Sequence, residues 1–258
     1  MTGSDPLPSG HAPWVAPTWH APSSVRAMVS TRQAPGASMP PYDRCNLGLR
    51  SGDDPQLVRA NRAALVGALS LPAAPCWLQQ VHGSDVARVD DLPAGGEPVA
   101  DAAVTRAPGR PLAILTADCL PVLFHDTCGR VVAAAHAGWR GLAAGVLERT
   151  VEAMEVPAGT VHAWLGPCIG AASYEIGGEV REAFLSRDAG HAACFVPTRP
   201  GHWRCDLAGL ARRVLDAAGV GRVDGGGFDT FTDARFYSYR RDGARSGRFA
   251  SLVWLAPA

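Results

Sequence analysis

Residues 112–124, Leu-Ala-Ile-Leu-Thr-Ala-Asp-Cys-Leu-Pro-Val-Leu-Phe, decide the fold because they form an apolar run that four residues interrupt. The apolar flanks predict two buried strands, and the segment 116–119 predicts a break between them, since buried polar groups cost free energy unless they are paired. Pro121 also argues against one uninterrupted central strand. The break places Asp118 beside Cys119, which is either a buried structural thiol or a site residue.

A further buried strand is predicted over residues 130–135, and it ends in His136-Ala-Gly-Trp-Arg-Gly141. This sequence is typical of a turn from a strand into a helix, where site residues often lie. Asp54 and Asp206 are predicted N-caps of two other helices. Because strands and helices alternate without an internal repeat, the sequence predicts an α/β or α+β fold. The other predicted strands cover residues 25–31, 78–89, 161–165, 236–240 and 249–255, within one catalytic domain over 24–258 that follows a loose Pro/Gly/Ser-rich arm over 1–23.

The composition excludes several classes of function. The 258 residues contain 24 Lys plus Arg and 24 Asp plus Glu, so no nucleic-acid or membrane-surface partner is indicated. All basic side chains are arginine, which excludes P-loop and Schiff-base chemistry. There is no apolar stretch long enough to span a membrane and no signal-peptide pattern. Seven cysteines without short paired spacing indicate reduced thiols, and together these features predict a cytoplasmic protein.

Three residues are the candidate metal ligands: His82, Cys119 and His136. Their separations in the sequence are long and do not match a zinc-finger pattern. The donor types are more informative, since two imidazoles and one thiolate suit zinc and leave one coordination position open for water or substrate. Each histidine taken alone could equally be structural.

Several longer motifs occur in a fixed order, and together they resemble the YfiH-type family over about residues 13–258. That family is known as purine nucleoside phosphorylase and, under an older label, as multicopper polyphenol oxidase or laccase domain. The motifs are Asn46-Leu-Gly-Leu49, Gly52-Asp-Asp-Pro55, Asn61-Arg62, Gln80-Val-His-Gly83, Thr116-Ala-Asp-Cys-Leu-Pro-Val122, Ala135-His-Ala-Gly-Trp-Arg-Gly141, Gly166-Pro-Cys-Ile-Gly170 and Phe236-Tyr-Ser-Tyr-Arg-Arg-Asp242.

The resemblance implies a single-domain α-β-β-α sandwich of two mixed sheets flanked by helices, similar to bacterial deamidating toxins. It implies zinc on His82, Cys119 and His136. It also implies phosphorolysis of adenosine, inosine, guanosine and methylthioadenosine, with adenosine deamination as a second activity. The expected partners are therefore small-molecule nucleosides and phosphate, and the expected state is a monomer or small homo-oligomer. Two departures from the family pattern, Arg50-Ser51 and Asp229-Thr230, bear on substrate preference.

Four residues are candidates for the remaining roles. Asp118 is a candidate proton shuttle, or else a turn residue or a support for the metal ligands. Arg62 and Arg140 are candidate phosphate ligands, or else surface arginines. Asn46 is a candidate contact for ribose or base, or else a turn residue.

Three other functions fit parts of the pattern. Copper on the same three ligands would make a phenol oxidase, although eight histidines without a His-X-His pair do not suit a multicopper cluster. A metal-free Cys119–His136 dyad would make an amide hydrolase. A purely structural zinc would make a protein-interaction or cell-envelope maintenance factor.

Overall fold

The structure, a computed structural model, describes residues 12–93 and 95–257. Its centre is a six-stranded mixed sheet, in which the outer pairs at both edges are parallel and the inner strands are antiparallel. In spatial order its strands are β12 (Arg222–Gly225), β8 (Val161–Leu165), β6 (Leu120–Asp126), β7 (Val132–Ala137), β4 (Ala102–Thr105) and β3 (Val86–Arg88).

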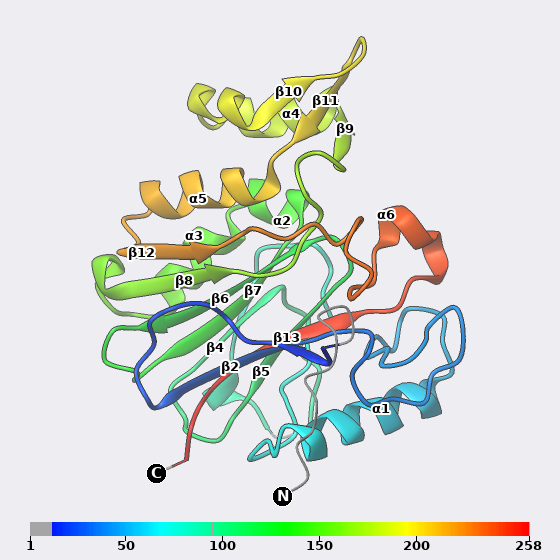
Figure 1. Cartoon of the computed structure of the whole chain (residues 1–258). Coiled ribbons are helices and arrows are strands. Elements are labelled where there is room, and N and C mark those ends of the chain that lie inside the picture. Colours follow the sequence, from blue (N-terminus) through cyan, green and yellow to red (C-terminus); the bar gives the residue numbers. More distant parts are fainter. Residues whose placement is uncertain (1–11, 94, 258) are drawn as a thin grey trace, which may run out of the picture.

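A second, four-stranded sheet packs face to face with the first (Figure 1). It is antiparallel throughout, so only one of the two sheets is mixed. Leu112 and Ile114 of this sheet share a buried cluster with Leu123 and Trp164 of the six-stranded sheet, and this cluster fills the space between the two. Its strands, in spatial order, are β1 (Trp14–Val15), β2 (Val25–Ser30), β13 (Phe249–Leu255) and β5 (Leu112–Thr116).

Helices cover both outer faces and complete the expected α-β-β-α sandwich (Figure 1). Alternate residues of β6, such as Val122 and Phe124, point away from the inter-sheet cluster and pack under α3 and α5. Leu65 of α1 packs with Ala113 and Leu252 on the outer face of the other sheet. The helices are α1 (Pro55–Ala68), α2 (Trp139–Ala143), α3 (Val146–Ala153), α4 (Gly178–Leu185), α5 (Leu207–Ala217) and α6 (Tyr239–Asp242), with 3₁₀ turns at Val89–Asp91, Ala158–Thr160, Ala189–Cys194 and Gly243–Arg245.

A small three-stranded antiparallel sheet, which the sequence did not predict, lies beyond α5 together with α4 (Figure 1). Its strands are short, and their sequence lacks the apolar runs of the central strands. They are β10 (Phe195–Pro197), β11 (His202–Cys205) and β9 (Glu175–Gly177).

Most of the predicted elements are present. The break predicted at 116–119 lies at 117–119, between β5, which includes Thr116, and β6. Asp54 accepts a hydrogen bond from Gln56 N at 2.8 Å as the N-cap of α1. Asp206 caps α5 by accepting from Gly209 N. Within the expected N-terminal arm, Trp14–Val15 pairs with β2 as an edge strand, whereas residues 1–11 lie outside the described residues.

Two predicted strands are wrong. Residues 78–89 contain a regular strand only at Val86–Arg88, because the backbone turns at His82, which has φ 61°. Residues 236–240 do not form a strand, because Ser238 caps the start of α6 by accepting a hydrogen bond from Arg241 N. The alternation of Tyr237 and Tyr239 therefore reflects a loop that leads into a helix.

All seven cysteines lie in the described residues and are free thiols. Over the same residues, none of the helices has both the length and the apolar character needed to cross a membrane.

Candidate functional site

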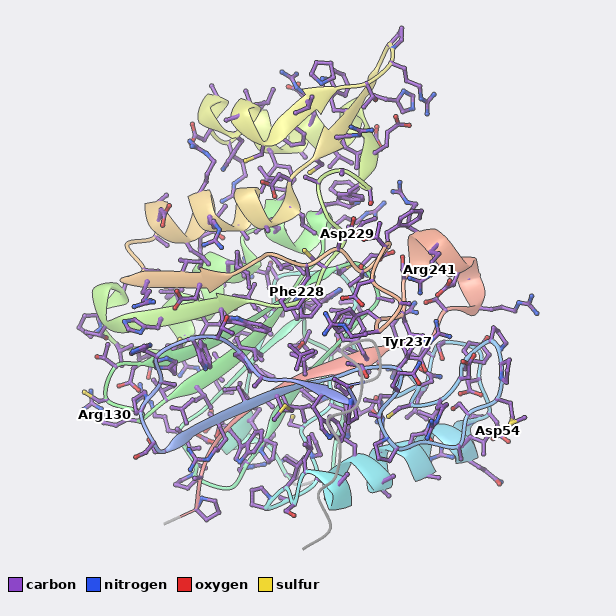
Figure 2. All side chains as sticks on the ribbon, in the orientation of Figure 1. Asp54, Arg130, Phe228, Asp229, Tyr237 and Arg241 are labelled. Atoms are coloured by element: carbon purple, nitrogen blue, oxygen red, sulfur yellow. The ribbon has the colours of Figure 1, made fainter. Side chains whose placement is uncertain are left out.

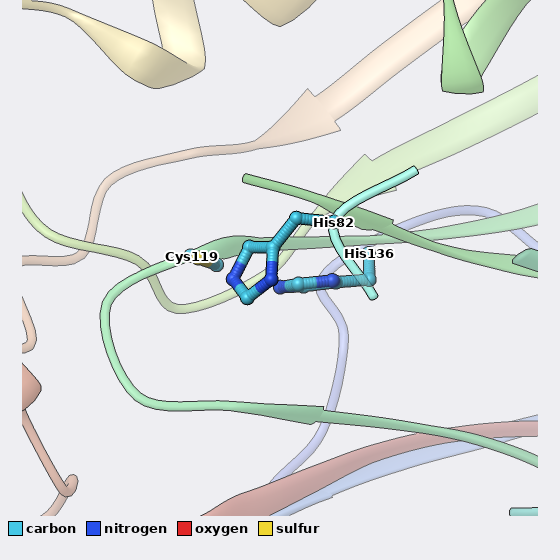
Figure 3. A group of neighbouring side chains, drawn as sticks. All are labelled: His82, Cys119 and His136. Carbon is cyan, nitrogen blue, oxygen red and sulfur yellow. The ribbon is translucent and has the colours of Figure 1, made fainter. Parts of the chain in front are cut away.

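The structure brings His82, Cys119 and His136 together at one end of the six-stranded sheet (Figure 3). One ligand atom from each lies within 4.8 Å of the other two. Antiparallel pairing of β6 and β7 places Leu120 opposite Ala137, so Cys119, which directly precedes β6, lies next to His136. His82 reaches the pair from the turn before β3. Within the described residues, these three form the only group of three or more His, Cys, Asp or Glu residues whose ligand atoms lie this close together.

The local backbone leaves room for these side chains. Asp118 has φ 88°, so the chain bends immediately before Cys119 instead of continuing as a strand. Gly138 follows β7, and a Cβ there would lie 2.9 Å from Cys119 Sγ and 3.2 Å from His82 Cδ2. A Cβ on Gly141 would lie 2.7 Å from Gly83 O. The two glycines of the His-Ala-Gly-Trp-Arg-Gly motif therefore allow the three segments to approach closely.

Asp101 organises two of the three candidate ligands, and the sequence analysis did not identify it. Its carboxylate is fully buried and accepts hydrogen bonds from Val81 N (3.1 Å), His82 N (2.9 Å) and Gly83 N (2.6 Å). It also accepts from His136 Nδ1 at 2.8 Å, which directs Nε2 of that ring toward the other ligands. The available signal was a carboxylate in the otherwise apolar stretch 99–104, since a buried carboxylate needs donors.

The electrostatics of the group favour a thiolate. Burial alone would raise the pKa of Cys119, but the positive charge and hydrogen bond of His136, with a further contribution from His82, lower that pKa to about 6. Burial alone would lower the pKa of His136, but the Cys119 thiolate and Asp101 raise it to about 9. Burial opposes ionisation of Asp101 as well, yet its hydrogen bonds hold its pKa below the usual value. A thiolate is the form that binds a metal ion.

The three side chains open into a cavity of about 630 Å³, a size typical of small-molecule sites. Aromatic rings line it, and three of them stack with arginines. The Cζ atom of Arg140 lies 4.4 Å from the ring centroid of Trp139, that of Arg240 lies 5.3 Å from Tyr174, and that of Arg248 lies 6.0 Å from Tyr239. The lining residues are Gly48, Leu49, Arg50, Ser51, Arg62, Leu78, Gln80, His82, Leu115, Thr116, Ala117, Asp118, Cys119, His136, Trp139, Arg140, Ile169, Tyr174, Tyr239, Arg240 and Arg248.

Asp118 is the single carboxylate in this lining, within the described part of the chain. Its Oδ1 accepts from Thr230 Oγ1 at 2.6 Å, and its Oδ2 accepts from Arg240 N at 2.6 Å. The side chain is therefore held in place by the segment between β12 and β13, where Figure 2 labels Asp229, Tyr237 and Arg241.

The candidate phosphate ligands differ in their environment. Arg62 lines the cavity, but its Nη1 is paired with Glu97 at 2.7 Å and its Nε donates to Leu47 O. Burial lowers the pKa of Arg62, although the bond to Glu97 opposes this shift. Arg140 is exposed and has no ion pair with any described residue. Arg140 therefore has a positive charge without a carboxylate partner at the cavity, whereas Arg62 is paired with Glu97.

Asn46 does not line the cavity. It is fully buried, and its Nδ2 donates to Ser51 Oγ (2.8 Å) and Asp53 Oδ2 (2.9 Å). Its Oδ1 accepts from Gly48 N (3.0 Å) and Arg248 N (2.9 Å). These four bonds use the full hydrogen-bonding capacity of the Asn46 side chain. It therefore has no free polar atom for the direct ribose or base contact that the sequence predicted.

The two departures from the family pattern both occupy defined places. Arg50 lines the cavity and pairs with Glu97 at 3.3 Å. Asp229 lies behind the lining, where it accepts from Gly170 N at 2.9 Å and Ser173 Oγ at 2.6 Å. Arg50 is therefore placed to contact a ligand, and Asp229 supports the loop that carries Tyr174.

Comparisons with known proteins agree on one family. Residues 26–256 match the family model described as multi-copper polyphenol oxidoreductase laccase. A Pseudomonas aeruginosa protein named purine nucleoside phosphorylase is 52% identical, over 94% of this chain and 98% of its own. The Escherichia coli purine nucleoside phosphorylase YfiH is 47% identical, over 93% and 98%. A Neisseria meningitidis crystal structure superimposes with a TM-score of 0.91 at 43% identity, covering 95% of this chain and all of that one.

Proposed function

This chain belongs to the family described as multi-copper polyphenol oxidoreductase laccase, and we propose that it is a zinc-dependent purine nucleoside phosphorylase. One observation carries the proposal: two imidazoles and a thiolate converge on a cavity that arginine side chains also line. Relatives at about half identity bear the name purine nucleoside phosphorylase, which agrees with a site for a nucleoside and an anion. The proposed substrates are adenosine, inosine, guanosine and methylthioadenosine.

The donor set fits a zinc ion. His82, Cys119 and His136 are three protein ligands, which is the number that catalytic zinc sites use while one position stays open. When bound, zinc would supply a Lewis acid that withdraws electrons from a substrate atom. A copper ion could use the same three ligands, so metal analysis of the purified protein distinguishes the two.

The remaining residues suit phosphorolysis. Arginines hold phosphate so that one of its oxygens faces C1′ of the ribose. The new C1′–O bond forms as the C1′–N9 bond breaks, and the bonding electrons leave with the purine. The proton that hydrogen phosphate gives up on becoming an ester passes to the purine. We assign that proton transfer to Asp118, because it is the one carboxylate in the described lining and is held by Thr230 and Arg240. The products are ribose 1-phosphate and the free base.

Adenosine deamination is the second proposed activity, and the same residues would support it. A zinc site that deaminates a purine needs a carboxylate to move protons between water and the leaving amine. Asp118 lies beside Cys119 at the bend with φ 88°, so it shares the cavity with the three ligands. Deamination requires no phosphate, which separates the two activities experimentally.

The test is an incubation of the purified protein with adenosine or inosine, with and without phosphate. We expect phosphate-dependent release of adenine or hypoxanthine, and phosphate-independent formation of inosine from adenosine. The Cys119→Ala variant should lose both activities. Wild-type activity in that variant would contradict the assignment of the site.

Three further outcomes address the alternatives. Copper in the purified protein and oxygen-dependent oxidation of phenols would favour the oxidase. Activity on amides that survives a chelator but is lost on thiol alkylation would favour a metal-free Cys119–His136 dyad. Bound zinc with turnover of no nucleoside would indicate a structural metal.

A further inference from the structure

We infer that Arg248 binds the phosphate co-substrate, in the cavity that Asp118 and Cys119 also line. The inference rests on the proposed function and names the residue that confers its dependence on phosphate. Of the five arginines in the cavity lining, Arg50 and Arg62 are both paired with Glu97. Arg140, Arg240 and Arg248 form no ion pair with any described residue, so their charges have no direct counter-ion.

Arg248 differs from the other two because it is half-buried, whereas Arg140 and Arg240 are exposed. It makes no ion pair with a carboxylate among the described residues. Its Nη1 donates to the carbonyls of Ser246 (2.6 Å) and Gly247 (2.9 Å), which are uncharged acceptors. A half-buried cation with no direct ion pair is costly, so a charged ligand in contact with this guanidinium would stabilise it.

The side chain is also held in position before any ligand binds. Asn46 Oδ1 accepts from the backbone N–H groups of both Gly48 and Arg248. The backbone of Gly48 lies directly against the stem of Arg248, since a Cβ at position 48 would be 2.7 Å from Arg248 Cγ. Asn46 therefore has an indirect role, which is to fix the residue that contacts phosphate. Preorganisation of this kind lowers the entropic cost of binding an anion.

The surroundings indicate where the anion would lie. Burial lowers the pKa of Arg248, and the charges of Cys119 and Asp118 oppose that shift without cancelling it. Arg248 thus shares one cavity with the candidate metal ligand Cys119 and with Asp118, the residue assigned to proton transfer. Nε and Nη2 have no partner among the described residues and remain available for a phosphate oxygen pair.

The experiment compares Arg248→Gln, Arg248→Lys and Arg140→Gln with the wild type, all loaded with zinc. Arg222→Gln is the matched control, because Arg222 is an exposed arginine on the edge strand β12 that pairs with Asp224. We expect Arg248→Gln to raise the KM for phosphate by about tenfold or more, while the KM for inosine changes less than about threefold. Arg248→Lys should give an intermediate KM for phosphate, because it keeps the charge without the planar fork.

An unchanged phosphate KM in Arg248→Gln, or a larger increase in Arg140→Gln, would overturn the inference. Calorimetric titration with inorganic phosphate separates its failure from that of the proposed function. If the wild type releases no base, the proposed function is wrong. Loss of phosphate binding in Arg248→Gln would still support the phosphate subsite in that case. Absence of phosphate binding to the wild type would refute the subsite. Circular dichroism checks folding, and the lysine variant replaces the glutamine variant if the latter does not fold.

Discussion

Substitution of Asp101 by Asn should weaken metal binding and destabilise the fold, although the two side chains have nearly the same shape. All four partners of the Asp101 carboxylate are donors: three backbone N–H groups at 2.6–3.1 Å and His136 Nδ1 at 2.8 Å. An asparagine has only one oxygen, so its NH₂ group must face two of these donors in either orientation.

The structure allows the size of the effect to be estimated. If the asparagine oxygen replaces Oδ1, the N–H groups of Val81 and Gly83 lose their acceptor. Val81 is exposed and Gly83 is half-buried, so the loss of these two hydrogen bonds costs about 1–3 kcal/mol of unfolding free energy in total. In the other orientation the NH₂ group faces His136 Nδ1, which favours the tautomer with a proton on Nε2 and removes that nitrogen as a ligand. Loss of such a supporting carboxylate lowers metal affinity about 10- to 100-fold.

The assay is a competition for zinc between the protein and a chromophoric chelator, together with urea unfolding of the metal-free protein. Asp85→Asn is the control, because the Asp85 side chain is 81% exposed and forms only a long ion pair with Arg149. A cobalt-loaded sample adds a spectroscopic test, since altered thiolate and imidazole coordination would shift its absorption. Wild-type zinc affinity in Asp101→Asn, with an unaltered cobalt spectrum, would refute the reasoning.

Three other predictions concern the same group of ligands. Elemental analysis should find no zinc in Cys119→Ser but wild-type zinc in Cys168→Ser. Burial holds the pKa of the Cys168 thiol far above its usual value, so this thiol does not form the thiolate that binds a metal ion. Equal zinc contents in the two variants would contradict the ligand assignment. In metal-free protein, the rate of Cys119 alkylation should have its midpoint near pH 6, because the thiolate fraction falls as pH drops below that value. Mass spectrometry of the Cys119 peptide measures this rate. A midpoint near pH 9 would show that His136 does not stabilise the thiolate. Gly138→Ala should abolish zinc binding, because its Cβ would lie 2.9 Å from Cys119 Sγ. Gly67→Ala in α1 meets no atom within 4 Å and should increase the unfolding free energy by about 0.5–1 kcal/mol. Calorimetric titration with zinc and thermal unfolding test the two variants, and wild-type zinc affinity in Gly138→Ala would show that the close contact between residue 138 and Cys119 is not essential.

Elements governed by neighbouring residues could be predicted from the sequence. The helix after Asp54 begins where expected because its N-cap and Pro55 act over a few residues. The break at 116–119 was visible because polar residues and a proline do not suit a buried strand. The donor types of the metal group were also readable, since His82, Cys119 and His136 carry their chemistry in their side chains.

What the sequence by itself determined, then, was the class of the fold and the donor types of a candidate metal site. Only the tertiary structure decided how that centre is assembled. It placed Asp101 against the backbone turn at His82, where a strand had been predicted. It also showed that Asn46 supports Arg248 instead of contacting a ligand. The physical reason is that hydrogen-bond donors and acceptors find partners through strand register and loop approach, across segments far apart in the chain, whereas capping and hydrophobic periodicity act between residues a few positions apart.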